Sequence, residues 1–217
     1  MKLVSGNIEK IYESKVADKY DFSIPPFFTR WKKKAFYDSS LKKGDTVLVF
    51  CCGTGLDFPH ILKKIGKEGK IVGVDFSSEM LSQAKEKIRK NRWENIELIE
   101  ADITKFTKVK SKIDSYFDVG VCTLGMSIIP GYKQAYSNLV SFVKKQGEII
   151  IGDMQLASGW FGVLDPVTIF LSKKFGGTRE GHQNSKELYA IMQKDLSAVV
   201  KKEFFFKAYY YCIGKKQ

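Results

Sequence analysis

The chain has 217 residues, of which 44% are hydrophobic and 28% are charged. This composition is typical of a folded single domain and excludes collagen-like, coiled-coil and wholly disordered proteins. The net charge of +12 is spread over lysine pairs along the chain, and neither a membrane-spanning run nor a signal peptide is recognisable.

Apolar runs alternate with amphipathic segments from about residue 46 onward. Strands are predicted at 46–50, 70–76, 96–101, 117–124 and 147–154, and helices at 57–65, from 77 onward, and at 132–143. Such alternation predicts βαβ units and a parallel sheet. The last two apolar runs, 199–206 and 208–213, leave no room for a crossover helix, so we expect an antiparallel pair. The prediction is an α/β fold with a seven-stranded sheet, a reversed strand at one end and helices on both faces.

Three successive strand ends carry residues suited to binding a nucleoside. The first strand leads into a glycine-containing loop, where Gly53 and Gly55 allow close approach of a ligand to the backbone. The second ends in Asp75, placed to accept both ribose hydroxyls, and the third ends at Asp102. Because ligands bind beyond the carboxyl ends of parallel strands, these elements are expected to form one site. The alternatives are a plain turn for the glycine loop, a helix cap for Asp75 and a turn former for Asp102.

The loop lacks the glycine and lysine motifs that bind the phosphates of nucleotides, and this narrows the type of nucleoside. The third glycine of a dinucleotide fingerprint would fall at Phe58, and the chain has no phosphate loop of the G-x-x-x-x-G-K type. A cofactor without phosphate fits better, which points to S-adenosyl-L-methionine.

The segments VLVFCCGTG, GVDFSSEML, ELIEADI and FDVGVCTL resemble the successive motifs of class I S-adenosylmethionine-dependent methyltransferases. The branch that looks most similar contains ubiquinone/menaquinone C-methyltransferases and phospholipid N-methyltransferases. The resemblance implies a Rossmann-like fold in which the glycine loop lines the methionine end of the cofactor. It also implies that Asp75 binds the ribose, that Phe76 and Met80 lie against the adenine, and that the end of the fourth strand lies near the substrate mouth. The full set of implied cofactor-binding residues is Tyr20, Cys51, Gly53, Thr54, Gly55, Asp75, Phe76, Met80, Ala101, Asp102, Ile103, Cys122 and Thr123.

Two positions depart from the family pattern. Val49 stands where an acidic residue is usual, and Cys51 stands where glycine is usual. Asp57 or a loop carbonyl is expected to replace the missing acid.

The whole chain, 1–217, is predicted to be one methyltransferase domain. It divides into an N-terminal helical cover at 1–45, a cofactor-binding core at 46–154, a lid and helix at 155–198, and a terminal strand pair at 199–214. The expected activity is methyl transfer from S-adenosyl-L-methionine to a small-molecule or lipid-like acceptor, with S-adenosyl-L-homocysteine as product.

Two other functions stay open: methylation of RNA or protein, and a non-catalytic cofactor-binding scaffold. The scarcity of arginine argues against a nucleic-acid partner. Contact with an anionic membrane surface, and a monomer or homodimer, are also left open. Scattered cysteines indicate a reducing, cytoplasmic compartment and no metal site. Cys51 and Cys52 are interpreted as packing residues and His182 as structural rather than as a catalytic base; no catalytic residue is assigned.

Overall fold

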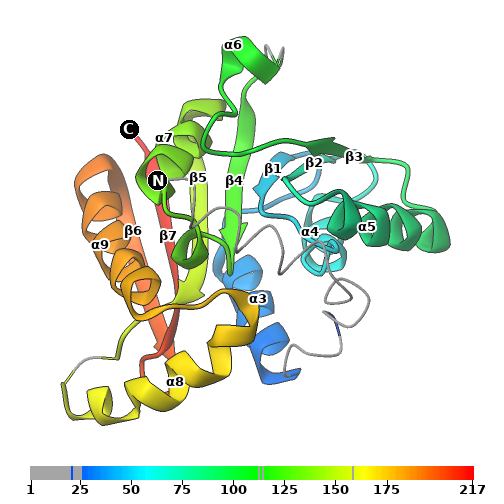
Figure 1. Ribbon diagram of the computed structural model, residues 1–217. Coiled ribbons are helices and arrows are strands. Elements are labelled where there is room, and N and C mark those ends of the chain that lie inside the picture. Colours follow the sequence, from blue (N-terminus) through cyan, green and yellow to red (C-terminus); the bar gives the residue numbers. More distant parts are fainter. Residues whose placement is uncertain (1–20, 22–25, 112, 114, 158) are drawn as a thin grey trace.

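The computed structural model describes residue 21 and residues 26–111, 113, 115–157 and 159–217 (Figure 1). The strands are β1 (Thr46–Phe50), β2 (Lys70–Asp75), β3 (Ile96–Glu100), β4 (Phe117–Thr123), β5 (Val143–Met154), β6 (Leu196–Phe204) and β7 (Tyr209–Lys216). The α-helices are α3 (Pro26–Asp38), α4 (Phe58–Ile65), α5 (Ser78–Asn91), α6 (Lys108–Ser111), α7 (Tyr132–Phe142), α8 (Asp165–Ser172) and α9 (Arg179–Asp195). Three short 3₁₀ turns are η1 (Met126–Ile128), η2 (Gly159–Leu164) and η3 (Lys173–Phe175).

The strands form one seven-stranded sheet in the order β3-β2-β1-β4-β5-β7-β6. Strands β1 to β5 pair in parallel, whereas β7 is antiparallel to both β5 and β6. The predicted fold class and the antiparallel terminal pair are therefore confirmed. The reversed strand, however, is not the edge strand, because β7 lies between β5 and β6. The reason is burial: β7 is buried from Tyr209 to Gly214, whereas β6 alternates between half-buried and exposed positions and suits the edge.

The sheet is covered on both faces because its strands alternate between two cores. In β1, Leu48 and Phe50 belong to one core with residues of α7 and α9. Val47 and Val49 belong to the other core, with residues of α3, α4 and α5. Residues of β1 are thus buried on both sides, as a continuous apolar run predicts.

Local capping signals set the helix boundaries near the site. The Ser77 hydroxyl accepts a hydrogen bond from Met80 N at 3.2 Å and begins α5. Gly66, with φ of 70°, ends α4. One expectation differs from the structure. Strand β5 begins at Val143, directly after α7, rather than at residue 147.

The parallel order brings the carboxyl ends of β1, β2, β3 and β4 to one edge of the sheet. In Figure 1 the strands β4 and β5 run toward the bottom of the view, and α8 lies beyond that edge. No helix within the described part of the chain is both long and apolar enough to cross a bilayer.

Candidate functional site

The loop after β1 is shaped by residues in left-handed conformations. Cys51, Gly53 and Gly55 have φ values of 51°, 52° and 76°. A Cβ at Gly55 would lie 2.5 Å from the Phe58 ring, so a side chain would collide with the first turn of α4. A Cβ at Gly53 would lie 3.2 Å from the Met80 methyl group. The loop therefore lies close against both following helices, and glycine is required for that approach.

Asp75 joins the ends of β1 and β2. Its carboxylate accepts hydrogen bonds from Gly53 N at 2.8 Å and from Ser77 N at 3.1 Å. Burial raises the pKa of Asp75, while the backbone N–H donors of Ser77, Gly53 and Phe76 act in the opposite direction. The α5 cap is supplied by Ser77, so Asp75 is more than a helix cap: it holds the glycine loop in place.

Asp102 lies beyond the end of β3 in a turn. Its carboxylate accepts hydrogen bonds from Thr104 N at 2.9 Å and Thr104 Oγ1 at 2.6 Å, and Lys105 Nζ lies 2.9 Å from its other oxygen. This is the turn-forming arrangement that the sequence left open as an alternative. Ala101 N donates to Asp75 O at 2.8 Å, which fixes the third strand end beside the second.

The end of β4 contributes a buried polar chain. Thr123 Oγ1 donates to Asp57 Oδ2 at 2.5 Å, and Asp57 Oδ1 lies 3.0 Å from Lys32 Nζ of α3. Both charged side chains are 8% exposed. A buried ion pair thus links α3 to the loop after β1 and, through Thr123, to the end of β4. Nothing in the sequence pointed to Lys32, because its partner lies on another element.

Three cysteines, Cys51, Cys52 and Cys122, lie at or beneath this edge. Cys122 is fully buried, and a Cβ at Gly125 would lie 2.6 Å from Cys51 Sγ and 3.0 Å from Cys122 Sγ. Interaction with Cys122 and burial both raise the pKa of Cys51, and burial raises that of Cys52. Neither thiol is set up as a thiolate nucleophile, which supports the packing interpretation.

Asp153, at the end of β5, is a polar residue that the sequence analysis missed. It is 1% exposed and accepts hydrogen bonds from Ser127 N at 2.8 Å, Ser127 Oγ at 2.6 Å and Met154 N at 2.7 Å. Burial raises the pKa of Asp153 to about 6. Its carboxylate holds η1 against the end of β5. An acidic residue closing a predicted strand was the signal that could have found it.

His182 lies in α9 and is fully buried. Its Nε2 lies 3.2 Å from Ser172 Oγ, and burial lowers its pKa to about 4. The neutral, enclosed ring supports the structural interpretation. Within the described residues, no group of three or more His, Cys, Asp or Glu side chains is placed to hold a metal ion.

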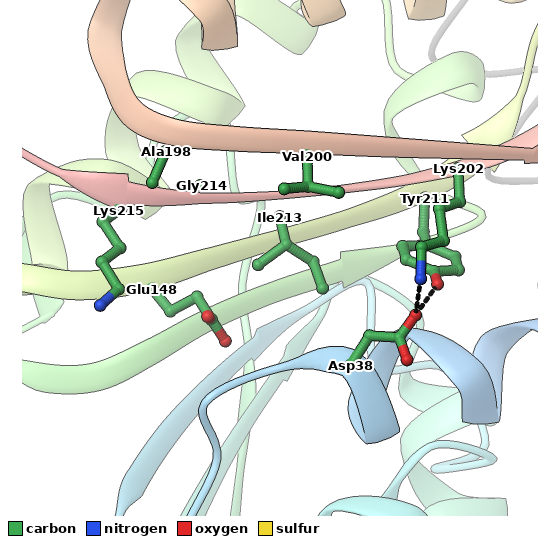
Figure 2. Close-up of a pocket in the computed structure, with 9 residues that line it drawn as sticks. All are labelled: Asp38, Glu148, Ala198, Val200, Lys202, Tyr211, Ile213, Gly214 and Lys215. Carbon is green, nitrogen blue, oxygen red and sulfur yellow. Dashed lines mark hydrogen bonds and ion pairs between the residues drawn. The ribbon is translucent and has the colours of Figure 1, made fainter.

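A cavity of about 370 Å³ lies elsewhere, between the end of α3 and strands β5, β6 and β7 (Figure 2). There Asp38 accepts hydrogen bonds from Tyr211 and Lys202, whose Nζ lies at 2.6 Å. Glu148, another lining residue, stands near the amino end of the parallel part of β5. None of the predicted cofactor-binding residues lines this cavity, so it is not the predicted site.

The structure brings most of the predicted residues to one sheet edge. Asp75, beside the half-buried Phe76 and with Met80 against Gly53, provides a carboxylate flanked by apolar side chains. Such a donor set fits a ribose with an adjoining base. The gathered residues are Cys51, Gly53, Thr54, Gly55, Asp75, Phe76, Met80, Ala101, Asp102, Ile103 and Thr123. Cys122 lies beneath them in the core, and Tyr20 is outside the described residues.

Comparison with known proteins gives a consistent picture. A family model described as "Methyltransferase domain" matches residues 41–203. The chain is 27% identical over 175 residues to a demethylmenaquinone methyltransferase of Listeria welshimeri, covering 78% of this chain and 72% of that protein. It is 29% identical over 147 residues to a protein of the same name from Bacillus cereus, covering 66% and 60% of the two chains.

Solved structures share the fold at low identity. A SAM-dependent methyltransferase from Aquifex aeolicus aligns over 98% of both chains with a TM-score of 0.64 and 17% identity. Magnesium protoporphyrin IX methyltransferase from Synechocystis PCC 6803, solved with bound SAH, aligns over 98% of this chain and 100% of that chain, with a TM-score of 0.70 and 13% identity.

Proposed function

Because this chain belongs to the methyltransferase domain family, we propose that it transfers a methyl group from S-adenosyl-L-methionine to a lipid-like small molecule of the quinone type. The family membership confirms the sequence-based prediction of a methyltransferase. The observation that carries the proposal is the hydrogen bond from Gly53 to Asp75. It joins a glycine loop to a buried carboxylate at adjacent strand ends, where an open parallel sheet binds its ligand.

The gathered residues are assigned to parts of the cofactor. Asp75 would accept the ribose hydroxyls, because its carboxylate lies at the end of β2, beside the glycine loop. Phe76 and Met80 would flank the adenine, with Ala101, Asp102 and Ile103 at its edge. The loop from Cys51 to Gly55, together with Thr123, would line the methionine end. When bound, the cofactor supplies a methyl group activated by a positively charged sulfur.

Asp57 is assigned the role of the acid that the family pattern usually has at the position of Val49. Val49 is 1% exposed and packs in the core, so this position offers the site no charge. Asp57 lies between the loops after β1 and β4, where its carboxylate accepts from Thr123. Lys32 compensates its charge when the cofactor ammonium is absent.

The chain's contribution to the reaction is positioning and exclusion of water. The hydrogen bonds of Asp75 fix the glycine loop, and those of Asp153 fix η1 against the end of β5, so both segments are held before a ligand arrives. Fixed near-attack geometry removes much of the entropic barrier to methyl transfer. No side chain is assigned as a general base.

A quinone-type acceptor is proposed because the relatives in two bacterial genera are named demethylmenaquinone methyltransferases. Methyl transfer from radiolabelled S-adenosyl-L-methionine tests it against four acceptors: a detergent-solubilised demethylmenaquinol, phosphatidylethanolamine, total RNA and total protein. We expect label in the quinone alone, and none with Asp75→Ala. Label only in nuclease-sensitive or protease-sensitive material would refute the quinone acceptor. Absence of cofactor binding by the intact chain would refute methyl transfer to any of these acceptors.

A further inference from the structure

Helix α8 exposes its apolar side chains and buries its polar ones. Asp165 and Thr168 are 7% and 5% exposed, whereas Val167, Phe170 and Leu171 are 56%, 76% and 54% exposed. The inward side is held by Asp165, whose Oδ1 accepts a hydrogen bond from Ala157 N at 2.8 Å, whereas the Thr168 hydroxyl donates within the helix to Leu164 O. An ordinary surface helix turns its apolar side chains toward the core and its polar side chains toward water. The orientation of the side chains in α8 is the reverse.

The exposed apolar surface continues beyond α8. Trp160 and Val163 of η2 are 80% and 71% exposed. Phe206, at the tip of the β6–β7 hairpin, lies 5.7 Å from Phe161 between ring centroids and is itself 56% exposed. We refer to Trp160, Val163, Val167, Phe170, Leu171 and Phe206 together as the α8 face.

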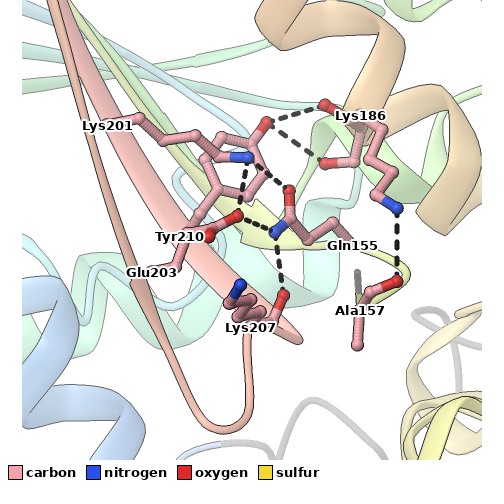
Figure 3. A network of polar contacts seen from close by, with 8 residues as sticks. Gln155, Ala157, Lys186, Lys201, Glu203, Lys207 and Tyr210 are labelled. Carbon is pink, nitrogen blue, oxygen red and sulfur yellow. Dashed lines mark hydrogen bonds and ion pairs between the residues drawn. The ribbon is translucent and has the colours of Figure 1, made fainter. Parts of the chain in front are cut away.

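The two segments that carry the α8 face are tied together by a polar network centred on Gln155 (Figure 3). Gln155 is fully buried and donates to Glu203 Oε1 at 2.6 Å and to Lys207 O at 2.8 Å. Lys186 Nζ donates to Ala157 O at 3.2 Å, beside the start of η2. The hairpin tip and the segment leading to α8 are therefore held in fixed relation, and the α8 face is one surface.

The exposed charges on the two segments that carry this face are positive. In residues 159–175 and 205–207, the exposed charged side chains are Lys173, Lys174 and Lys207, while Asp165 is buried. Exposed Trp, Phe and Leu side chains rimmed by lysines are typical of segments that lie in the interface of an anionic bilayer. The positive charge of this rim is complementary to negatively charged phosphate headgroups. It is not complementary to an apolar protein surface that lacks acidic residues.

The α8 face is also adjacent to the candidate site. Figure 1 shows α8 beyond the edge toward which β4 and β5 run. Phe205, next to Phe206, packs in a small cluster with Leu124, the first residue after β4. A surface bound through the α8 face would therefore lie near the end of β4, which forms part of the candidate site.

From this arrangement we propose that the α8 face docks the enzyme on membranes containing anionic phospholipids. The inference rests on the proposed function in one respect, because it names the surface from which a lipid-like acceptor is taken. The docking itself follows from the exposed side chains and lysines, and it is measured without cofactor or acceptor.

Flotation with phosphatidylcholine vesicles, with and without phosphatidylglycerol, tests the docking. We expect binding only when phosphatidylglycerol is present, and a loss of at least about tenfold in affinity for Phe170→Ser/Leu171→Ser, given the apolar area removed. Lys173→Gln/Lys174→Gln/Lys207→Gln should weaken binding by roughly a hundredfold, at about fivefold per lysine.

Matched controls lie on distant surfaces. Val109→Ser removes an apolar side chain that is 91% exposed on α6, and Lys67→Gln/Lys85→Gln/Lys90→Gln removes three exposed lysines. Both should bind as the parent chain does. Docking is refuted if no vesicle binds, if the controls lose as much as the test variants, or if Phe170→Ser/Leu171→Ser instead converts a dimer to a monomer in light scattering.

The two proposals fail separately. Vesicle binding without methylation of any quinone would overturn the proposed acceptor and leave docking supported. Methylation of a detergent-solubilised quinone without vesicle binding would overturn docking alone.

Discussion

The ammonium of Lys32 on α3 lies 3.0 Å from the carboxylate of Asp57, and both side chains are 8% exposed. The pair connects α3 to the loop that carries Gly53 and Gly55. Thr123, at the end of β4, donates to the other oxygen of Asp57. Three segments far apart in sequence thus meet at one buried charge pair beside the candidate site.

Lys32→Met should destabilise the chain by about 3–5 kcal/mol, because it leaves the Asp57 charge buried without its partner. Lys32→Met/Asp57→Asn should recover most of that loss, since the buried charge is then removed as well. Urea unfolding of Lys32→Met, Asp57→Asn and the double variant measures the coupling energy between the two side chains. Lys34→Met is the control, because that side chain is 48% exposed; an equal loss in both lysine variants would contradict the prediction.

Asp75→Ala should weaken binding of S-adenosyl-L-homocysteine by about 100-fold, as expected when hydrogen bonds to a charged acceptor are lost. The variant should also lose about 1–3 kcal/mol of stability, because Gly53 N and Ser77 N lose their acceptor. Titration calorimetry on the folded variant separates the two effects. Glu94→Gln, at an exposed position, is the control and should bind normally; tight binding by Asp75→Ala would remove Asp75 from the site.

Gly125→Ala should destabilise the chain by about 1–3 kcal/mol, because its Cβ would lie 2.6 Å from Cys51 Sγ and 2.7 Å from Cys51 Cβ. In a Cys51→Gly background the same change should cost at least about 1 kcal/mol less. Thermal unfolding of the four proteins gives the coupling. Gly162→Ala, where the nearest atom would be 3.8 Å away, should be tolerated. Additive effects would show that the loops after β1 and β4 do not pack as described.

His182 should make the fold sensitive to acid. Burial lowers its pKa from 6.5 to about 4, so between these values the unfolded state binds a proton that the folded state does not. Stability is therefore full above pH 6.5 and falls by roughly 3 kcal/mol as the pH drops to 4. Urea unfolding across this range should show a shallower fall for His182→Gln than for the parent. A glutamine substitution of the half-buried His60 is the control. If the free energy of unfolding falls as steeply with pH in His182→Gln as in the parent chain, His182 does not cause the acid sensitivity.

Asp153 should make the fold more stable in acid, which is the opposite of the effect of His182. Burial raises its pKa from 3.8 to about 6, so the folded state binds the proton more readily. Its contribution is fully present below pH 3.8 and is lost as the pH rises through 6, a change of roughly 3 kcal/mol. Relative to Asp153→Asn, the parent chain should gain stability as the pH is lowered from 7 to 4. A difference between the two proteins that stays constant with pH would contradict this.

The strands around the site could be predicted because their signals are local. Residues 46–50 form a continuous apolar run, and Ser77 and Gly66 act on their own helices. Asp75 was found for the same reason, since it closes a recognisable strand. The alternation of strands and helices then requires parallel pairing, which gathers the strand ends at one edge.

The side-chain partners could not be predicted in this way. The turn at Asp102 depends on Thr104 and Lys105, which contact the two different oxygens of its carboxylate. Asp153 depends on Ser127, which reaches it only when β4 and β5 are side by side.

By itself, then, the order of residues determined the secondary structure, the parallel core and the family, because periodicity, caps and motifs act over a few neighbouring residues. Only the tertiary structure decided that β7 enters the sheet inside β6, that Lys32 neutralises Asp57, and that α8 turns Phe170 outward while burying Asp165. These outcomes depend on which surfaces are buried against one another and removed from water. Contacts between distant parts of the chain determine that burial.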